Sequence, residues 1–325
     1  MTNTSTIERR HVVSRSPAAP AVRRRSRSGR PAWEEPPTPV GQAAKGLTLG
    51  GVLAVIVVPL WIIVLTSVSS PGAVNRAGGL VIWPDGLSLQ AYREMLGDST
   101  VRTALLVSLG ITVVGTGLSM VVSVLCAYGL SRSRSLGHRF ILLLLIITMF
   151  VGGGMIPTFL VVTGLGGYNQ YWALILPSVV SVFNILVLRS FYSSTSGELI
   201  DAARADGAGD WRILWSVVLP TSRAVTAVIA LFYGVGYWNS FFNVMLYMPT
   251  ESEKWPLQYV LLTYVNRGVG LPGSVNSGFG SAGAQTAPLS LQMAVVVLTL
   301  VPLLIVYPFV QKHFRTGVLT GAIKG

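Results

Sequence analysis

Six long apolar segments dominate this chain and limit what it can fold into. They lie at about 47–68, 103–130, 140–162, 171–192, 223–247 and 289–310. A membrane-spanning helix needs roughly 20 mostly apolar residues, and each segment is long enough. A charge at the middle of a bilayer costs on the order of 3 kcal/mol or more, and all twelve Asp and Glu lie outside the six segments. The sequence therefore predicts an all-α, polytopic membrane protein with six transmembrane helices.

The scarcity of charged and metal-binding residues excludes several function classes. Only 11% of the 325 residues are charged, whereas soluble proteins carry about a quarter. The single Cys, Cys126, excludes an internal disulfide, and the three His show no HExxH or HxxxH spacing. No GxxxxGK[ST] motif occurs, and the GxGxxG match at 268–273 is not a nucleotide site because it lies in an external loop. We expect a non-enzymatic chain with no cofactor or metal of its own.

The net charge of +12 is distributed unevenly along the chain. Nine of the 24 Lys and Arg lie in residues 1–45, and most of the others lie in the loop at 131–139, the region 189–223 and the C-terminal tail. The positive-inside rule then places both termini and the polar loop 195–220 in the cytoplasm. Residues 1–45 are predicted to form a disordered basic tail that contacts anionic lipid or has a specific regulatory or binding role, and nucleic acid is not expected as a partner. The membrane domain is expected to cover 46–325.

The polar loop 195–220 has the signals of two short helices. Thr195 to Glu198 fits a capping box for a helix that ends at about Arg204 or Ala205. Gly207 and Gly209 should break it, and Asp210 is expected to cap a second helix ending at Pro220. The loop is therefore predicted to form a helix–turn–helix elbow at the membrane surface, with Asp201 and Arg204 on one face.

Three sets of residues inside the apolar segments are candidates for packing or for a substrate pathway. Small residues repeat at helical spacing in the second and fifth segments, which permits close helix approach: Gly115, Ser119, Ser123 and Ala127, and Thr226, Ala230 and Gly234. A glycine-rich break interrupts the third segment, as a simple kink or as a gate beside a cavity: Gly153, Gly154 and Pro157. Amides and aromatics meet in the fifth segment, as sugar-binding groups or as helix contacts and an interfacial aromatic belt: Trp238, Asn239, Phe242 and Asn243.

The loop 195–220 resembles the EAA loop of binding-protein-dependent ABC transporter permeases. Asp201-Ala202-Ala203 is followed after three residues by Gly207, and Leu219-Pro220 closes the loop. Two positions depart from the family pattern, since Asp201 replaces Glu and Gly197 replaces the usual Pro. Further stretches extend the resemblance over about 50–325, to the maltose-type carbohydrate permeases and their LplC-like branch, which is associated with complex oligosaccharides: 84–92, 127–132, 153–158, 172–177, 238–242, 256–258 and 317–325.

The resemblance implies the fold of a type I ABC importer permease in a bacterial plasma membrane. It also implies the partners: a second, homologous permease subunit, two ABC ATPase subunits that hold ATP and Mg, and an extracellular solute-binding protein. The residues expected to dock the ATPases are Glu198, Asp201, Ala202, Ala203, Arg204, Asp206 and Gly207. A secondary, ion-coupled sugar carrier is the alternative, although such carriers show inverted repeats and embedded ionisable groups, neither of which is visible in this sequence.

Overall fold

The computed structural model describes residues 38–132, 137–195, 197–267 and 288–322. Within these ranges the chain is helical, apart from turns and an isolated bridge between Ser69 and Leu87. The chain divides into two units, residues 1–55 and 56–325. The all-α prediction is confirmed for the described part of the chain. Most of the expected tail and the glycine-rich motif at 268–273 lie outside the described residues.

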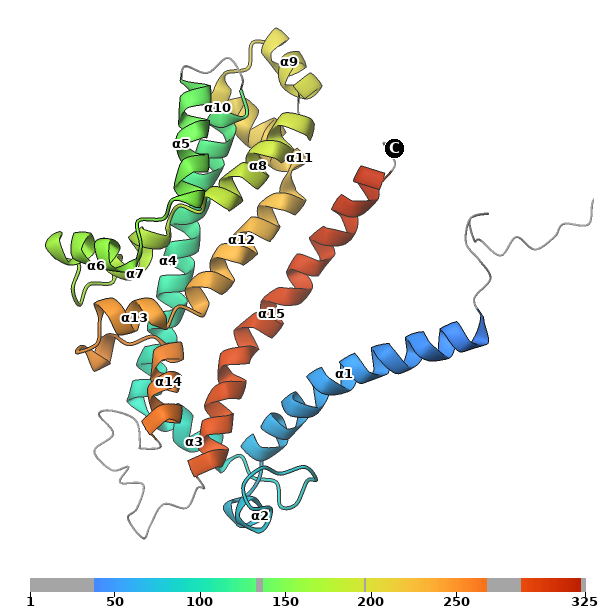
Figure 1. Ribbon diagram of the computed structural model, residues 1–325, viewed down its shortest axis with the longest axis vertical. Helices are drawn as coiled ribbons and strands as arrows, with labels where there is room; N and C mark the ends of the chain where they lie inside the picture. Colours follow the sequence, from blue (N-terminus) through green and yellow to red (C-terminus); the bar gives the residue numbers. More distant parts are fainter. Residues whose placement is uncertain (1–37, 133–136, 196, 268–287, 323–325) are drawn as a thin grey trace, which may run out of the picture. The chain divides into compact units, whose positions relative to one another are not determined.

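Three helices are long and apolar enough to cross a membrane unaided (Figure 1). They are α1 (Pro39–Ser67), α4 (Ser99–Leu130) and α15 (Pro288–Ala322). Helix α1 begins at Pro39, ahead of the expected domain boundary at 46, and proline suits a first helical position because it has no N–H to leave unpaired. Asp98 caps α4, because its side chain accepts a hydrogen bond of 2.7 Å from the backbone N–H of Thr100.

The other three predicted segments are bent or broken helices. The third comprises α5 (His138–Phe150) and α6 (Met155–Gly164), which meet at 113°. The fourth comprises α7 (Trp172–Ile175), η1 (Leu176–Ser178) and α8 (Val182–Thr195), with a bend of 50°. The fifth comprises α12 (Arg223–Trp238) and α13 (Phe242–Tyr247). The described helices give up to six spans when three bent pairs each count as one: α5 with α6, the α7–η1 segment with α8, and residues Asp210–Thr221 with α12, the last pair bent by 87°.

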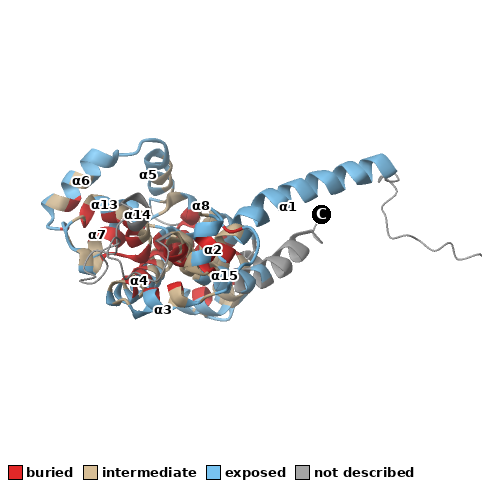
Figure 2. Cartoon of the chain, turned by 90° about the horizontal axis from the view of Figure 1, so that it is seen from below, coloured by how far each residue is buried: buried red, intermediate tan, exposed pale blue. Residues whose placement is uncertain are grey.

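Short helices connect these elements. Outside the 195–221 region they are α2 (Pro71–Arg76), α3 (Gln90–Gly97), η3 (Ser252–Lys254) and α14 (Leu257–Arg267). Ala91 and Met95 form the buried face of α3, which packs against α4 and α15. None of the side chains in α5 is buried, and most residues of α5 and α6 have the colour of exposed residues in Figure 2. Such surface is expected for helices that face lipid or another subunit.

Helix α4 is central to the core and packs along α12 and α8. Its predicted small-residue face is the face that is buried: Gly115, Ser119, Ser123 and Ala127. Ser119 Oγ lies 2.9 Å from the Tyr237 hydroxyl, and Ser123 Oγ lies 2.7 Å from the Tyr233 hydroxyl. On α12, however, the predicted small-residue face of Thr226, Ala230 and Gly234 is only half-buried. The buried positions of this helix are instead Val225, Ile229, Tyr233, Tyr237 and Trp238. Small residues on α4 therefore accommodate tyrosines from α12.

Candidate functional site

The region 197–221, named the coupling element here, consists of α9 (Gly197–Ala205), α10 (Asp210–Ile213), the π-helical turn η2 (Leu214–Val218) and α11 (Leu219–Thr221). Helix α9 ends in a left-handed turn at Gly207, whose φ is 80°. The Gly207 N–H donates to the Arg204 carbonyl and the Ala208 N–H donates to the Ala203 carbonyl, both at 2.9 Å. This pair of bonds is the Schellman motif, so the glycine of the EAA-like pattern is the residue that ends the helix.

The two faces of α9 differ in burial. Ile200 is buried and Ala203 packs partly on the core. The other predicted docking residues whose side chains are described are exposed: Asp201, Ala202, Arg204 and Asp206. Asp201 and Arg204, which were expected to share a face, form an ion pair with 3.8 Å between Oδ1 and Nη1. Leu199 is 51% exposed, three residues before Ala202; sequence reasoning missed it, although this spacing places both on one helix face. The side chains of the proposed capping box, including Glu198, lie outside the described part.

Asp210 does not cap the second helix, which corrects the expectation from the sequence. Gly209 occupies the N-cap position, with no side-chain hydrogen bond to the helix. The Asp210 carboxylate instead binds Arg132, with 2.7 Å between Nη1 and Oδ1. A charged hydrogen bond to a guanidinium is stronger than one to a neutral backbone N–H, which favours this alternative for a first-turn carboxylate.

Arg132 also contacts the end of α4. Its guanidinium lies 4.4 Å from the centre of the Tyr128 ring and donates to the Tyr128 hydroxyl. That hydroxyl in turn donates to the backbone carbonyl of Asp210 at 3.1 Å. The hydrogen bond from Arg132 lowers the pKa of the Asp210 carboxyl, and the same bond raises the pKa of Arg132. Both residues lie outside the six apolar segments predicted from the sequence, and both stay ionised through the neutral pH range.

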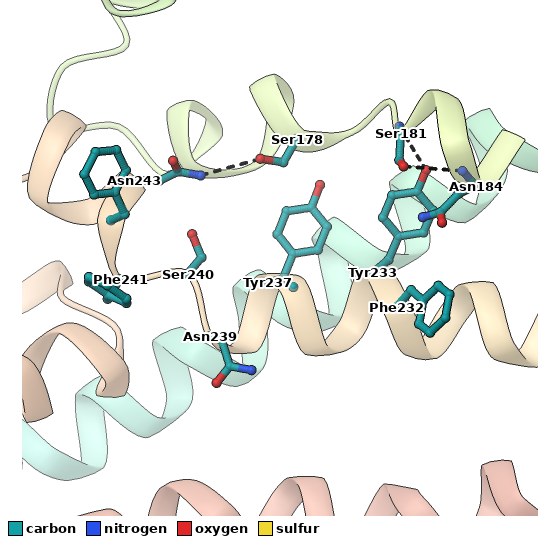
Figure 3. A pocket seen from close by; sticks show the side chains of 12 residues that line it. Ser178, Ser181, Asn184, Phe232, Tyr233, Tyr237, Asn239, Ser240, Phe241 and Asn243 are labelled. Atoms are coloured by element: carbon teal, nitrogen blue, oxygen red, sulfur yellow. Dashed lines mark hydrogen bonds between the residues drawn. The ribbon is translucent and has the colours of Figure 1, made fainter. Parts of the chain in front are cut away.

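A cavity of about 320 Å³ lies between the η1–α8 segment and the α12–α13 segment (Figure 3). Its lining combines hydroxyls, amides and aromatic rings: Ser178, Ser181, Asn184, Phe232, Tyr233, Gly236, Tyr237, Asn239, Ser240, Phe241, Phe242 and Asn243. The break between α12 and α13 turns Asn243 toward Ser178, with 3.5 Å between its amide nitrogen and Ser178 Oγ. Hydroxyls and amides of this kind exchange hydrogen bonds with a hydroxyl-rich ligand, and aromatic rings bury its apolar faces.

The structure brings together only part of the predicted pathway residues. Asn239, Phe242 and Asn243 line the cavity. The Asn239 amide, however, points away from Ser178 in Figure 3, and its oxygen accepts a hydrogen bond of 3.3 Å from Gln258.

The remaining predicted pathway residues lie elsewhere. Trp238 is buried and donates to the Thr299 carbonyl at 3.0 Å, so it joins α12 to α15. Gly153, Gly154 and Pro157 are exposed at the α5–α6 joint and are not among the residues that line the cavity.

Sequence reasoning missed the half of the cavity contributed by the fourth segment. Ser178, Ser181 and Asn184 are polar residues at and after the break between η1 and α8. Their signal in the sequence was three polar side chains at three-residue spacing, within an apolar segment. Polar residues in that setting face protein or a cavity more often than lipid.

Comparison with known proteins gives a consistent result. A family model described as "binding-protein-dependent transport system inner membrane component" matches residues 115–320. Polygalacturonan/rhamnogalacturonan transport system permease protein YtcP of Bacillus subtilis (strain 168) is 42% identical over 75% of this chain and 85% of its own. Protein LplC of the same organism is 37% identical, over 86% of this chain and 93% of its own.

The chain belongs to this permease family. A solved bacterial ABC transporter involved in the import of the acidic polysaccharide alginate is also similar, with a TM-score of 0.76 and 30% identity over 85% of this chain and 96% of that chain. The permease family match runs from the middle of α4 into α15, so it includes both the coupling element and the cavity. As a family member, the chain is an inner membrane component of a binding-protein-dependent transport system.

Proposed function

We propose that this permease is one transmembrane subunit of an ATP-driven importer for carbohydrate, with oligosaccharides as its cargo. The cavity carries this proposal, because its hydroxyls, amides and aromatic rings are the groups that bind neutral sugar hydroxyls and pyranose faces. The names of the relatives support it, since YtcP is a polysaccharide transport permease and the solved neighbour imports alginate.

The proposed assembly contains four further subunits or partners. A second, homologous permease completes the pathway, two ATPase subunits bind ATP and Mg, and an extracellular solute-binding protein delivers the cargo. The exposed face of α9 is the proposed ATPase contact, because it projects from the bundle with Leu199 and Ala202 beside Asp201. This chain performs no hydrolysis in the scheme.

The proposed mechanism is a switch between two states of the helix bundle. ATP binding draws the two ATPases together and moves both coupling elements on the cytoplasmic side. The bundle then exchanges inward-facing and outward-facing forms, and the loaded receptor favours one of them. Both chain termini are placed in the cytoplasm, in agreement with the positive-inside distribution.

Uptake by the reconstituted complex tests the proposal. The two permeases and two ATPases, in proteoliposomes with external receptor, are supplied with a panel of labelled oligosaccharides. Asn243→Ala should raise the half-saturating concentration of receptor-bound sugar about two- to tenfold, the loss expected for one hydrogen bond. Asn75→Ala is the matched control, because Asn75 is exposed on α2 and does not line the cavity.

Two results would contradict this function. Sugar uptake that persists without ATP and follows an ion gradient would instead support a secondary carrier. An Asn243→Ala complex with unchanged uptake of every sugar in the panel would remove the cavity from the substrate pathway.

A further inference from the structure

Helix α4 contacts both functional regions of the chain. Its 32 residues form one continuous helix from Ser99 to Leu130, and a rigid secondary-structure element of this kind can carry coupling between its two ends. Near its C-terminal end it meets the coupling element, and further back it meets the tyrosines that line the cavity. Among the hydrogen bonds described above, α4 is the one described helix whose side chains bond both the coupling element and the tyrosines of the cavity.

Two contacts join the C-terminal end of α4 to the coupling element, through Tyr128 and through Arg132 just beyond the helix, and a third contact holds these two residues together. Arg132 binds the Asp210 carboxylate at 2.7 Å, the Tyr128 hydroxyl donates to the Asp210 carbonyl at 3.1 Å, and the Arg132 guanidinium covers the Tyr128 ring. An isolated ion pair with an exposed carboxylate contributes little. Here the guanidinium side chain is only 24% exposed and donates to both the Asp210 carboxylate and the Tyr128 hydroxyl. A planar guanidinium can do this while it stacks on the Tyr128 ring, whereas an ammonium has no flat face to stack.

Helix α8 fixes the same end of α4. Arg189 Nε donates to the Leu130 carbonyl at 2.8 Å, and Ser193 Oγ donates to the Ser131 carbonyl at 3.3 Å. These bonds satisfy carbonyls that the end of a helix leaves without intrahelical partners. The C-terminal end of α4 is therefore held by α8 as well as by the coupling element.

Further along, α4 meets the cavity wall through Ser119 and Ser123. These residues lie one turn apart on one face, about 14 to 20 Å from Arg132 at 1.5 Å per residue. Their hydroxyls bond Tyr237 and Tyr233, and both tyrosines line the cavity. Tyr233 additionally accepts a bond of 3.1 Å from the Ser181 N–H on the opposite wall.

We propose that Tyr128 and Arg132 form a latch that carries movement of the coupling element through α4 to Tyr233 and Tyr237, and so couples ATP turnover to the shape of the cavity. The latch rests on the proposed ATP-driven function. Both residues are positioning residues, because they act on the cavity through α4 and touch no substrate.

The test measures sugar transported per ATP hydrolysed by the reconstituted full complex. Arg132→Gln and Asp210→Asn should each lower this ratio about three- to thirtyfold, the range for residues along a coupling network, while receptor-independent ATP hydrolysis persists. The double variant should be no worse than Arg132→Gln, because the two residues act through one bond. Arg132→Lys should recover only part of the loss.

Arg76→Gln is the matched control. The Arg76–Asp85 pair has the same 2.7 Å separation, but both side chains are more than 60% exposed and the pair lies away from the coupling element and the cavity. Its loss should leave the transport ratio unchanged. If Arg132→Gln fails to assemble, as judged by size-exclusion chromatography, Tyr128→Phe takes its place with the same criterion, since it removes one oxygen atom and keeps the ring.

The outcomes separate the latch from the function on which it rests. A wild-type complex without ATP-driven uptake overturns the proposed function, and the latch with it. A wild-type complex that imports sugar, with variants that keep the normal ratio or with additive losses in the double variant, overturns the latch alone.

Discussion

At the residue scale, the structure gives a physical reason for the glycine in the EAA-like pattern, because Gly207 ends helix α9. The spacing of Asp201-Ala202-Ala203 and Gly207 predicted a short helix followed by a turn. The structure places Gly207 in the left-handed region, where the N–H groups of two successive residues return to the last turn of α9. The end of α9 at Ala205 was therefore predictable, because glycine at this position is a strong local signal.

The Gly207 turn leads to a prediction with an internal control. Gly207→Ala should lower uptake and loosen the coupling element, because a side chain in the left-handed region costs about 1–2 kcal/mol. Gly209→Ala should be nearly neutral, because Gly209 has φ of −73° and open space around its added Cβ. Limited proteolysis of the coupling element and sugar uptake measure the two effects. Equal behaviour of the two variants would show that the turn conformation is unimportant.

The contacts of Asp210 could not be predicted in the same way. Sequence reasoning placed its carboxylate on the nearest backbone N–H groups, which is the usual local solution for an aspartate at a helix start. The observed partner, Arg132, belongs to a different helix end and is remote in sequence. Local patterns carry no information on such pairs, since they depend on how α4 and α10 pack.

At the scale of elements, close packing of α4 on α12 depends on one missing side chain. A Cβ at Gly115 would lie 2.9 Å from the Tyr237 ring, whereas a Cβ at Gly117 meets nothing within 4 Å. Gly115→Ala should therefore destabilise the bundle by about 1–3 kcal/mol, the range for overpacking. Gly117→Ala should be neutral or slightly stabilising, because alanine favours a helix.

Thermal unfolding of the two purified variants in detergent measures this difference. A lower transition temperature for Gly115→Ala alone is the expected result. Coincident transitions for both variants would mean that Tyr237 moves aside without loss, and that the α4–α12 contact is looser than its geometry indicates.

The course of the bent segments was less predictable than their existence. Hydrophobicity and length indicated the third segment, and the glycines marked a break in it, which the sequence left open as a simple kink or as a gate beside a cavity. The observed angle of 113° exceeds a simple kink. Gly154, with φ of 79°, supplies a backbone conformation that other residues rarely adopt, while the direction of α6 depends on its contacts with α13.

At the scale of the whole molecule, membrane orientation is the expectation with the widest consequences. On a Cys126→Ala background, Ala202→Cys should react with a membrane-impermeant maleimide only in inverted vesicles, and Asn75→Cys only in intact cells. Both positions are exposed. The reverse labelling pattern would place the coupling element outside the cell, where no ATPase could reach it, and would contradict the proposed function.

The hydroxyl of Tyr233 belongs at once to the seam between two helices and to the wall of the cavity. A substitution that widened the cavity at this position would also remove the contact between α4 and α12, so substrate specificity and stability of the fold cannot change independently there. Divergence toward a new sugar should instead begin at Ser240 and Asn243, on the loop and helix beyond α12. Relatives that transport different sugars are expected to keep Tyr233 and to differ at the positions of Ser240 and Asn243.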